Sequence, residues 1–163
     1  MSRVKLMGVE FEDLSSRDMD YWIRPAIRED EPAIHSLVRS TLINPFGIHW
    51  SRFLIAVDKE DRLVGCGQVK VHRDGSRELA SIAVDPAWRR KGVASAVIER
   101  LVASHAPPLY LTCRPELESF YERFEFRAIR EADMPPYFRR VYRLVKWLNI
   151  ITRRRQGILV MRR

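Results

Sequence analysis

A basic cluster next to a glycine is the first feature of this sequence that could do chemistry. Arg89, Arg90 and Lys91 precede Gly92 in VDPAWRRKGVASAVIERL, where an apolar run ends and an amphipathic run begins. The first amides of a helix are unpaired and carry partial positive charge, so this junction suits a phosphate group. Gly92 lets a bulky anion approach the backbone, and Ala94 keeps the next position small. The residues alone fit either a phosphate cradle or an ordinary turn between a strand and a helix.

The surrounding elements must position this junction. YWIRPAI predicts a strand, and apolar residues at helical spacing after Asp30 predict a helix. Three apolar runs, FLIAV, LVGCGQVKV and ELASIAV, are separated by short polar turns and predict an antiparallel meander. Helices over 89–104 and 115–124 and short strands at PLYLT and FRAI follow. This order of elements predicts one mixed α/β domain.

The spacing around the glycine is similar to a known motif. Arg89-x-x-Gly92-x-Ala94, after a strand that ends in Val84-Asp85-Pro86, resembles the cofactor motif of the GNAT superfamily of acyl-CoA-dependent N-acyltransferases. FYERFEFRAI, at 120–129, resembles the aromatic-Tyr and Phe-strand signature of that family. The resemblance implies a GNAT-type mixed, mostly antiparallel central sheet flanked by helices. It also implies a splay between the fourth strand, ELASIAV, and the fifth, PLYLT.

The same resemblance implies acetyl-CoA as cosubstrate and no metal. The pantetheine arm is expected in the splay, hydrogen-bonded to backbone groups near Ala83 and Val84. In many members an Asn at one position bonds the pantetheine region; this chain has Arg114 at that position, and Arg114 is therefore the candidate cofactor contact there. The pyrophosphate is expected on the amides of the junction, which gives as binding residues Arg89, Arg90, Lys91, Gly92, Val93 and Ala94.

Transfer of an acetyl group from a thioester to an amine requires an acid for the departing thiolate. Tyr121 occupies the position of the family's usual general acid, and a phenol stays protonated at neutral pH. The alternative is core packing, because Leu117, Phe120 and Phe124 share its helical spacing. A glycine usually precedes the Phe that follows this tyrosine. Here the position is Glu125, at a helix exit that favours positive φ.

The amine must lose a proton, and the tetrahedral oxyanion must be stabilised. Glu78 begins the fourth strand, where several resembling families place a glutamate base that acts directly or through water. It fits a solvated charge at a strand start equally well. His72 is a further candidate base, because imidazole titrates near neutrality, although a turn histidine is often only exposed. The oxyanion donor is expected to be a backbone N–H close to Ala83.

Length and composition fit one folded domain. The chain has 163 residues, of which 46% are hydrophobic and 31% charged, both values typical of globular proteins. Cys66 and Cys113 lack the spacing of a zinc or redox motif. No signal-peptide pattern and no run of 18 apolar residues occurs, which makes a cytoplasmic location the expectation. We expect an N-terminal arm over 1–20 and a single domain over 21–163.

The net charge of +8 is concentrated at one end of the chain. Residues 131–163 hold nine Lys and Arg against two Asp and Glu, whereas residues 1–130 are nearly neutral. A basic helix over 136–152 and a last strand are predicted there. The helix fits packing with its charges in water, peripheral contact with an anionic membrane, contact with RNA, or a homodimer interface through Trp147. A nucleic-acid binder is disfavoured because residues 1–130 are nearly neutral.

The leading hypothesis is an acetyl-CoA-dependent N-acetyltransferase. It transfers acetyl to a primary amine, either a small amine or amino acid or a peptide amine, by direct attack. The alternative is a non-catalytic acyl-CoA-binding module whose basic C-terminal helix contacts a membrane, RNA or protein. The departures at Arg114 and Glu125 are the only support for that alternative in the sequence. The protein is expected to be a monomer or a homodimer.

Overall fold

The structure is a computed structural model. It describes residues 5–6, 9–10, 20–41, 47–152 and 157–163. Most of the arm expected over 1–20, and residues 153–156 between the predicted helix and the last strand, lie outside these residues. Within them, β1 (Lys5–Leu6) and β2 (Val9–Glu10) form a small antiparallel pair.

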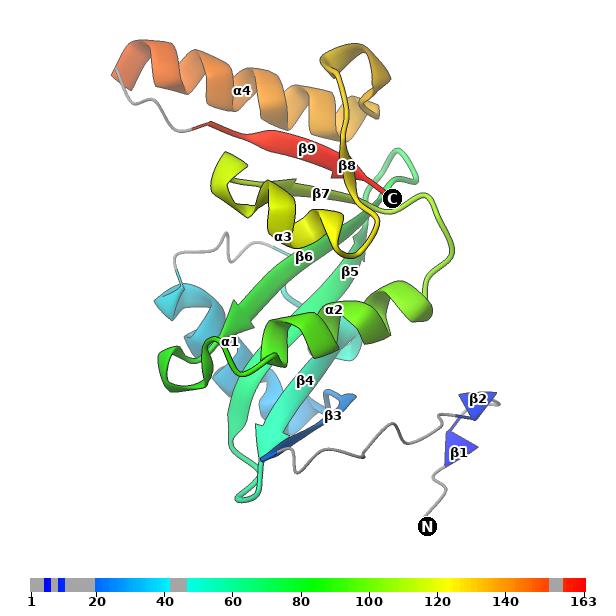
Figure 1. The fold of residues 1–163 in the computed structure, drawn as a ribbon, viewed down its shortest axis with the longest axis vertical. Helices are drawn as coiled ribbons and strands as arrows, with labels where there is room; N and C mark the ends of the chain where they lie inside the picture. The colour runs from blue at the N-terminus through cyan, green and yellow to red at the C-terminus, as the bar shows by residue number, and fades with distance from the viewer. Residues whose placement is uncertain (1–4, 7–8, 11–19, 42–46, 153–156) are drawn as a thin grey trace.

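A seven-stranded sheet forms the centre of the described chain, in the order β3-β4-β5-β6-β7-β9-β8 (Figure 1). All neighbouring strands are antiparallel except β6 and β7, which are parallel. This confirms the predicted meander and the mixed, mostly antiparallel fold class. The strands are β3 (Tyr21–Pro25), β4 (Phe53–Asp58), β5 (Leu63–Val71), β6 (Arg77–Val84), β7 (Tyr110–Cys113), β8 (Arg127–Ala128) and β9 (Leu159–Arg162).

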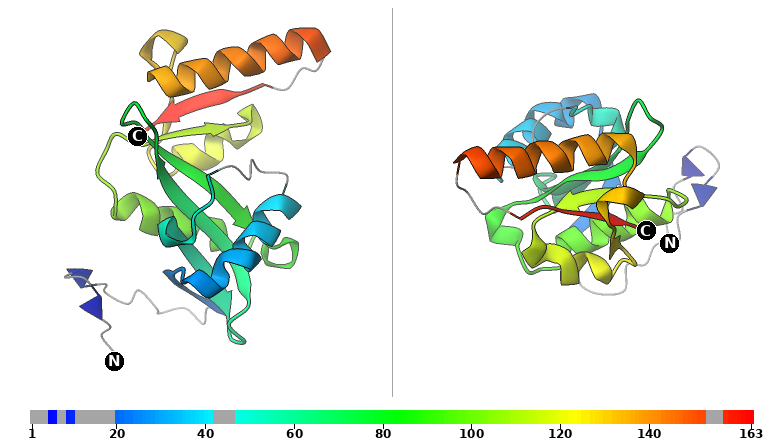
Figure 2. Two further views of the ribbon diagram at one scale, coloured as in Figure 1. Left: turned by 180° about the vertical axis from the view of Figure 1, so that it is seen from behind. Right: turned by 90° about the horizontal axis from the view of Figure 1, so that it is seen from above.

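Four helices cover the two faces of this sheet. Seen from above in Figure 2, α1 and α4 lie on one side and α2 and α3 on the other. Apolar packing agrees, because Ile34 of α1 and Phe138 of α4 are fully buried on the first face and Leu101 of α2 is almost fully buried on the second. The helices are α1 (Glu31–Ser40), α2 (Val93–Ala103), α3 (Glu118–Glu122) and α4 (Pro136–Thr152).

Two glycines in β5 let α2 lie close to the sheet. A Cβ on Gly67 would stand 2.5 Å from Ile82 Cδ1 and 3.0 Å from the side chains of Val97 and Leu101. A Cβ on Gly65 would collide with Val93, the first residue of α2. These positions therefore let α2 pack directly on β5 from its first residue to its middle.

The last strand is inserted into the sheet. β9 pairs with β7 over four residues and with β8 on its other edge, so residues 131–163 are not an appendage. The predicted helix over 136–152 is confirmed with the same bounds. Phe138, in the first half of α4, is fully buried, whereas Leu148, in its second half, is 43% exposed.

Candidate active site

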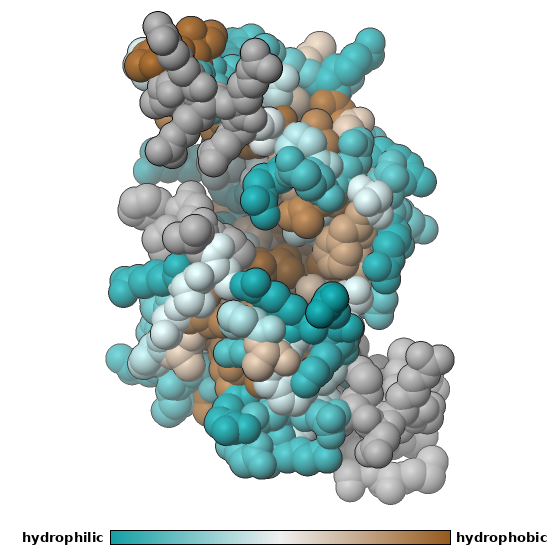
Figure 3. Space-filling view, turned by 60° about the vertical axis from the view of Figure 1, so that its left-hand side comes forward, coloured by the Kyte–Doolittle hydropathy of each residue, from teal (hydrophilic) through white to brown (hydrophobic). Residues whose placement is uncertain are grey.

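The two parallel strands at the centre of the sheet separate along their length. The pairing of β6 with β7 has one register position, Glu78 opposite Tyr110, whereas β7 and β9 pair at four. Beyond Glu78, β6 continues for six residues to Val84, about 20 Å of strand with its β7-side edge open. Figure 1 shows the two strands diverging, and Figure 3 shows the molecule hollowed at mid-height with apolar side chains in the hollow. This is the splay that the family resemblance implied.

The alternating direction of backbone groups along β6 decides which of them face the gap between β6 and β7. The Asp85 N–H donates to the Val64 carbonyl at 2.9 Å, toward β5. Because successive residues of a strand point their N–H and C=O groups to opposite edges, Ala83 also faces β5, and its carbonyl oxygen lies beside Gly65. Val84 and Ile82 then present their amides and carbonyls to the gap. Of the two residues expected near the pantetheine arm, Val84 therefore faces the gap and Ala83 does not, whereas Ile82 does.

A bulge in β6 causes this change. Ser81 has φ +56°, and two residues of β6, Ser81 and Ile82, stand opposite the single residue Gly67. A bulge reverses which face and edge the following residues use. Nothing in the letters ELASIAV indicates it, because serine rarely adopts positive φ.

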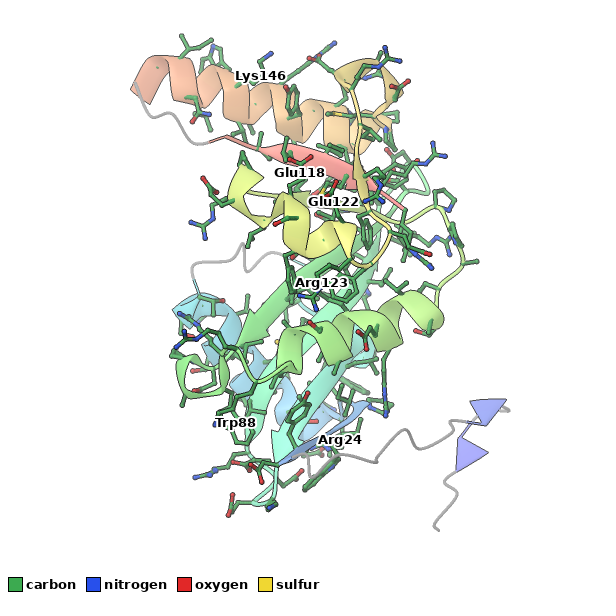
Figure 4. The ribbon with its side chains drawn as sticks, in the orientation of Figure 1. Arg24, Trp88, Glu118, Glu122, Arg123 and Lys146 are labelled. Carbon is green, nitrogen blue, oxygen red and sulfur yellow. The ribbon has the colours of Figure 1, made fainter. Side chains whose placement is uncertain are left out.

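The end of β6 leads into a short 3₁₀ helix over Pro86–Trp88. Asp85 caps it, with its Oδ1 accepting from the Ala87 N–H at 2.8 Å. The Lys91 Nζ stands 4.6 Å from the centre of the Trp88 ring, a cation–π contact that holds the lysine against the turn. Figure 4 shows Trp88 beyond the end of β6, at the start of α2.

The basic turn, residues 89–92, is exposed, and two of its residues have left-handed backbone conformations. Arg90 has φ +62° and Gly92 φ +82°, so the chain turns twice before α2 begins at Val93, four residues later than predicted. Val93 is buried and anchors the helix, while Arg89, Arg90 and Gly92 are exposed and Ala94 is partly buried. The first-turn amides of α2 thus stand at the surface beside three cations, an arrangement that fits a pyrophosphate.

Tyr121 lies on the other side of the gap, on α3. Its ring makes T-shaped contacts with Phe120 and Phe126, at 5.2 Å and 6.3 Å between ring centres. Burial, together with the neighbouring Cys113, raises the pKa of the Tyr121 phenol to about 12. Burial likewise raises the pKa of the Cys113 thiol to about 11, with smaller contributions from Glu118 and Glu116. The Tyr121 phenol and the neighbouring Cys113 thiol are therefore both protonated at neutral pH.

Two departures from the family pattern flank this tyrosine. Arg114 is exposed at the end of β7, and because β6 and β7 are parallel, it lies at the same end of the gap as the basic turn. Glu125 has φ +67°, so the chain keeps the left-handed exit without a glycine. Its Oε2 accepts from Nη2 and Nε of Arg163 at 2.6 and 2.9 Å. The substitution thus leaves the path of the backbone intact.

The two predicted base candidates meet at the closed end of the gap. His72 Nε2 lies 2.9 Å from Glu78 Oε2, and these side chains are 13% and 11% exposed. The His72 ring stacks on Tyr137 of α4, with 3.4 Å between ring centres. Asp74 Oδ2 accepts from the Tyr137 N–H at 2.8 Å and so ties the β5–β6 turn to the start of α4. No local pattern predicts this contact, because it joins residues more than 60 positions apart.

A polar row continues from this pair along the face between α1 and α4. Lys70 stands opposite Glu78 in register, and burial lowers its pKa, although the charge of Glu78 opposes the shift. Gln68 is fully buried and donates from Nε2 to Ser81 Oγ at 3.0 Å and to the Gly47 carbonyl at 3.4 Å. Its amide oxygen has no partner among the described residues. This row offers hydrogen bonds and charge to a polar acceptor molecule.

Residues 49–128 match the protein family described as "Acetyltransferase (GNAT) domain". A search of curated proteins found none that matches at a significant level. In the part of the chain that the structure describes, no helix is long and apolar enough to cross a membrane, and no cluster of His, Cys, Asp and Glu is placed to hold a metal.

Solved structures share the fold. N-acetylglutamate synthase from Neisseria gonorrhoeae, complexed with coenzyme A and N-acetyl-glutamate, is 24% identical with a TM-score of 0.68, covering 90% of this chain and 36% of that one. Rv2747 from Mycobacterium tuberculosis, in complex with CoA, is 21% identical with a TM-score of 0.64, covering 86% and 96%. The ribosomal-protein-S18-alanine N-acetyltransferase of Escherichia coli is 18% identical with a TM-score of 0.59, covering 87% and 92%. This chain spans about a third of the length of the Neisseria synthase.

Proposed function

Because this chain belongs to the GNAT acetyltransferases, we propose that it transfers an acetyl group from acetyl-CoA to a primary amine by direct attack. One observation carries the proposal: the β6–β7 gap opens beside the exposed amides and cations of the basic turn. The acceptor class is a small amine or amino acid, or a peptide amine. Similar structures include both an N-acetylglutamate synthase and a ribosomal-protein alanine acetyltransferase, so both classes belong in the first screen.

The chain's own groups fit the cosubstrate. The open edge at Ile82 and Val84 offers amides and carbonyls to an extended pantetheine arm, which adds to β6 like another strand. The amides at 92–94 and the cations Arg89, Arg90 and Lys91 hold the pyrophosphate, with Arg114 at the same opening. Bound there, acetyl-CoA supplies the acetyl group as an activated thioester.

Tyr121 acts as the general acid. With a pKa of about 12 its phenol carries a proton at any physiological pH. A thiolate released nearby shares the environment that raises the Cys113 thiol to a pKa of about 11. The departing sulfur is thus nearly as basic as the phenolate, and the proton passes between groups of similar affinity.

Glu78 takes the proton from the attacking amine, directly or through one water, and His72 holds the carboxylate in place from 2.9 Å. The amine nitrogen forms the new bond to the acetyl carbon, and the carbon–sulfur bond breaks. One proton goes to Glu78 and another from Tyr121 to sulfur, so the products are an amide and a free thiol. A backbone N–H on the gap edge of β6, at Ile82 or Val84, is the proposed oxyanion donor.

The test begins with binding. Thermal unfolding is measured with and without acetyl-CoA and CoA, for the wild type and for Gly92→Glu. A carboxylate at 92 repels the pyrophosphate and strains a left-handed position, so the variant should lose the ligand-induced rise in melting temperature. Gly75→Glu, at another left-handed glycine with open space around it, controls for backbone strain.

Thiol release in a panel of amines then separates enzyme from binding module. Release with some amine supports the transferase. Tight CoA binding without release across amino acids, polyamines and peptides favours the non-catalytic alternative. Absence of any thermal shift at saturating CoA contradicts both, because each depends on the gap.

A further inference from the structure

Large apolar side chains are exposed mainly on one helix. Of the nine in the described residues that are at least about one-third exposed, five lie in the second half of α4, and their exposures run from 43% to 76%. Figure 3 shows apolar side chains gathered at the top of the molecule over this end of the helix. We call this surface the α4 tip, defined as Leu144, Trp147, Leu148, Ile150 and Ile151.

The first half of α4 is fixed to the domain, so the tip projects from a rigid base. Phe138 is fully buried against Tyr110 and Val160. Arg139 donates to the carbonyl oxygens of Glu131, Ala132 and Met134 at 3.0–3.2 Å. Arg143 and Glu131 form an ion pair at 2.6 Å. None of these contacts involves the tip.

Cations border the tip, and acids are absent from the sequence around it. From Met134 to the last residue the chain has nine Lys and Arg and no Asp or Glu. Arg140 and Lys146 are exposed on α4, and Lys146 is labelled on the helix in Figure 4. Three further arginines, 153–155, follow the helix in the sequence. The surface is therefore apolar at its centre and positive at its margins.

We propose that the α4 tip docks this domain on an anionic lipid surface. A basic amphipathic helix places its apolar side chains at the boundary between headgroups and acyl chains, and its cations contact lipid phosphates. Trp147 suits this boundary because its ring is apolar and its N–H is polar. The inference is independent of the proposed acetyl transfer, because no tip residue takes part in the gap.

Charge and residue type favour lipid over the other occupants. A second copy of the chain would bring two acid-free, basic helices together. RNA would use the arginines but leave Ile150 and Ile151 without apolar contact, since bases stack on aromatic rings. A bilayer with negative headgroups can contact both the apolar centre of this surface and its positive margins.

The experiment is cosedimentation of the full chain with vesicles of phosphatidylcholine alone and of phosphatidylcholine mixed with phosphatidylglycerol, at low and high salt. We expect binding only to the mixed vesicles, weakened by salt. Ile150→Asp should weaken it at least tenfold, since burial of one isoleucine is lost, and Arg140→Gln about fivefold. Ile27→Asp and Arg28→Gln, at exposed positions away from α4, should bind like the wild type.

Thermal unfolding first establishes that each variant folds, and Ile151→Asp replaces Ile150→Asp if that variant does not. Absence of binding to mixed vesicles at low salt would overturn the proposal, as would wild-type binding by the tip variants. Self-association that Ile150→Asp abolishes, without vesicle binding, would assign the tip to a second copy. RNA binding that Arg140→Gln weakens, without vesicle binding, would assign it to nucleic acid.

Discussion

Replacing Tyr121 by Phe should lower kcat by about 10- to 100-fold. The magnitude follows from the neighbouring thiol, because burial raises the pKa of Cys113 from 9.0 to about 11 in the same surroundings. Without an acid, a thiolate that leaves in these surroundings is destabilised by up to two pKa units, which corresponds to about 2.7 kcal/mol or about 100-fold in rate. Water that enters the site solvates the thiolate and reduces this cost. General acids commonly contribute factors of this size or larger.

The assay is thiol release at saturating acetyl-CoA with the best amine of the panel. Because the proton is transferred only in the transition state, kcat and kcat/KM should fall together while the thermal shift with CoA stays unchanged. Tyr142→Phe, on α4 and outside the proposed catalytic groups, is the matched control. A Tyr121→Phe enzyme within threefold of the wild type would refute the acid role.

The raised pKa of Tyr121 also sets a pH dependence. The folded-state pKa of about 12 exceeds the ordinary value of 10, so this group's contribution to stability is complete below pH 10 and is lost as pH rises through 12. Wild-type melting temperature should therefore fall more steeply between pH 10 and 12 than that of Tyr121→Phe. Equal slopes would mean that the phenol is not desolvated as described.

Three further predictions concern the site and its support. Glu78→Gln should lower kcat by about 100-fold or more at neutral pH. His72→Ala should lower kcat by less, because His72 acts through the Glu78 carboxylate. Equal activity of Glu78→Gln and wild type in thiol release would exclude Glu78 as the base. Glu125→Gly should stabilise the protein by up to about 1 kcal/mol in urea unfolding, because relief of the left-handed strain exceeds the loss of an exposed ion pair with Arg163. Gly67→Val should destabilise it by about 1–3 kcal/mol by forcing α2 from the sheet, and an unchanged midpoint would contradict the close packing.

Most elements of the fold could be predicted because apolar residues recur at a characteristic spacing within each strand and helix. The meander is readable from three apolar runs with polar turns, and α4 from its apolar face after a double proline. The position of β9 between β7 and β8 was not readable, because strand order depends on pairing between distant segments. The late start of α2 has a local cause: Arg90 adopts positive φ, which its residue type does not indicate.

Some residues of the candidate site could likewise be predicted from local sequence, whereas others are placed only by the fold. The basic turn and Tyr121 follow from local spacing, and their roles remain predictions. The pairing of His72 with Glu78 depends on a hairpin that folds one strand end onto the next, so the sequence offered two separate candidates where the structure has one hydrogen-bonded pair. The shift from Ala83 to Ile82 depends on a bulge at Ser81.

The placement of β9 decides how the C-terminal segment can be tested. Removing residues 131–163 would delete the strand that pairs with both β7 and β8, and would leave β7, one wall of the gap, without its other neighbour. It would also remove Tyr137, which stacks on His72 at the closed end of the β6–β7 gap. A truncated chain that lost both lipid binding and acetyl transfer would therefore say nothing about either. Single substitutions at exposed positions such as Ile150 leave these contacts in place, so only they separate a docking role of α4 from its structural one.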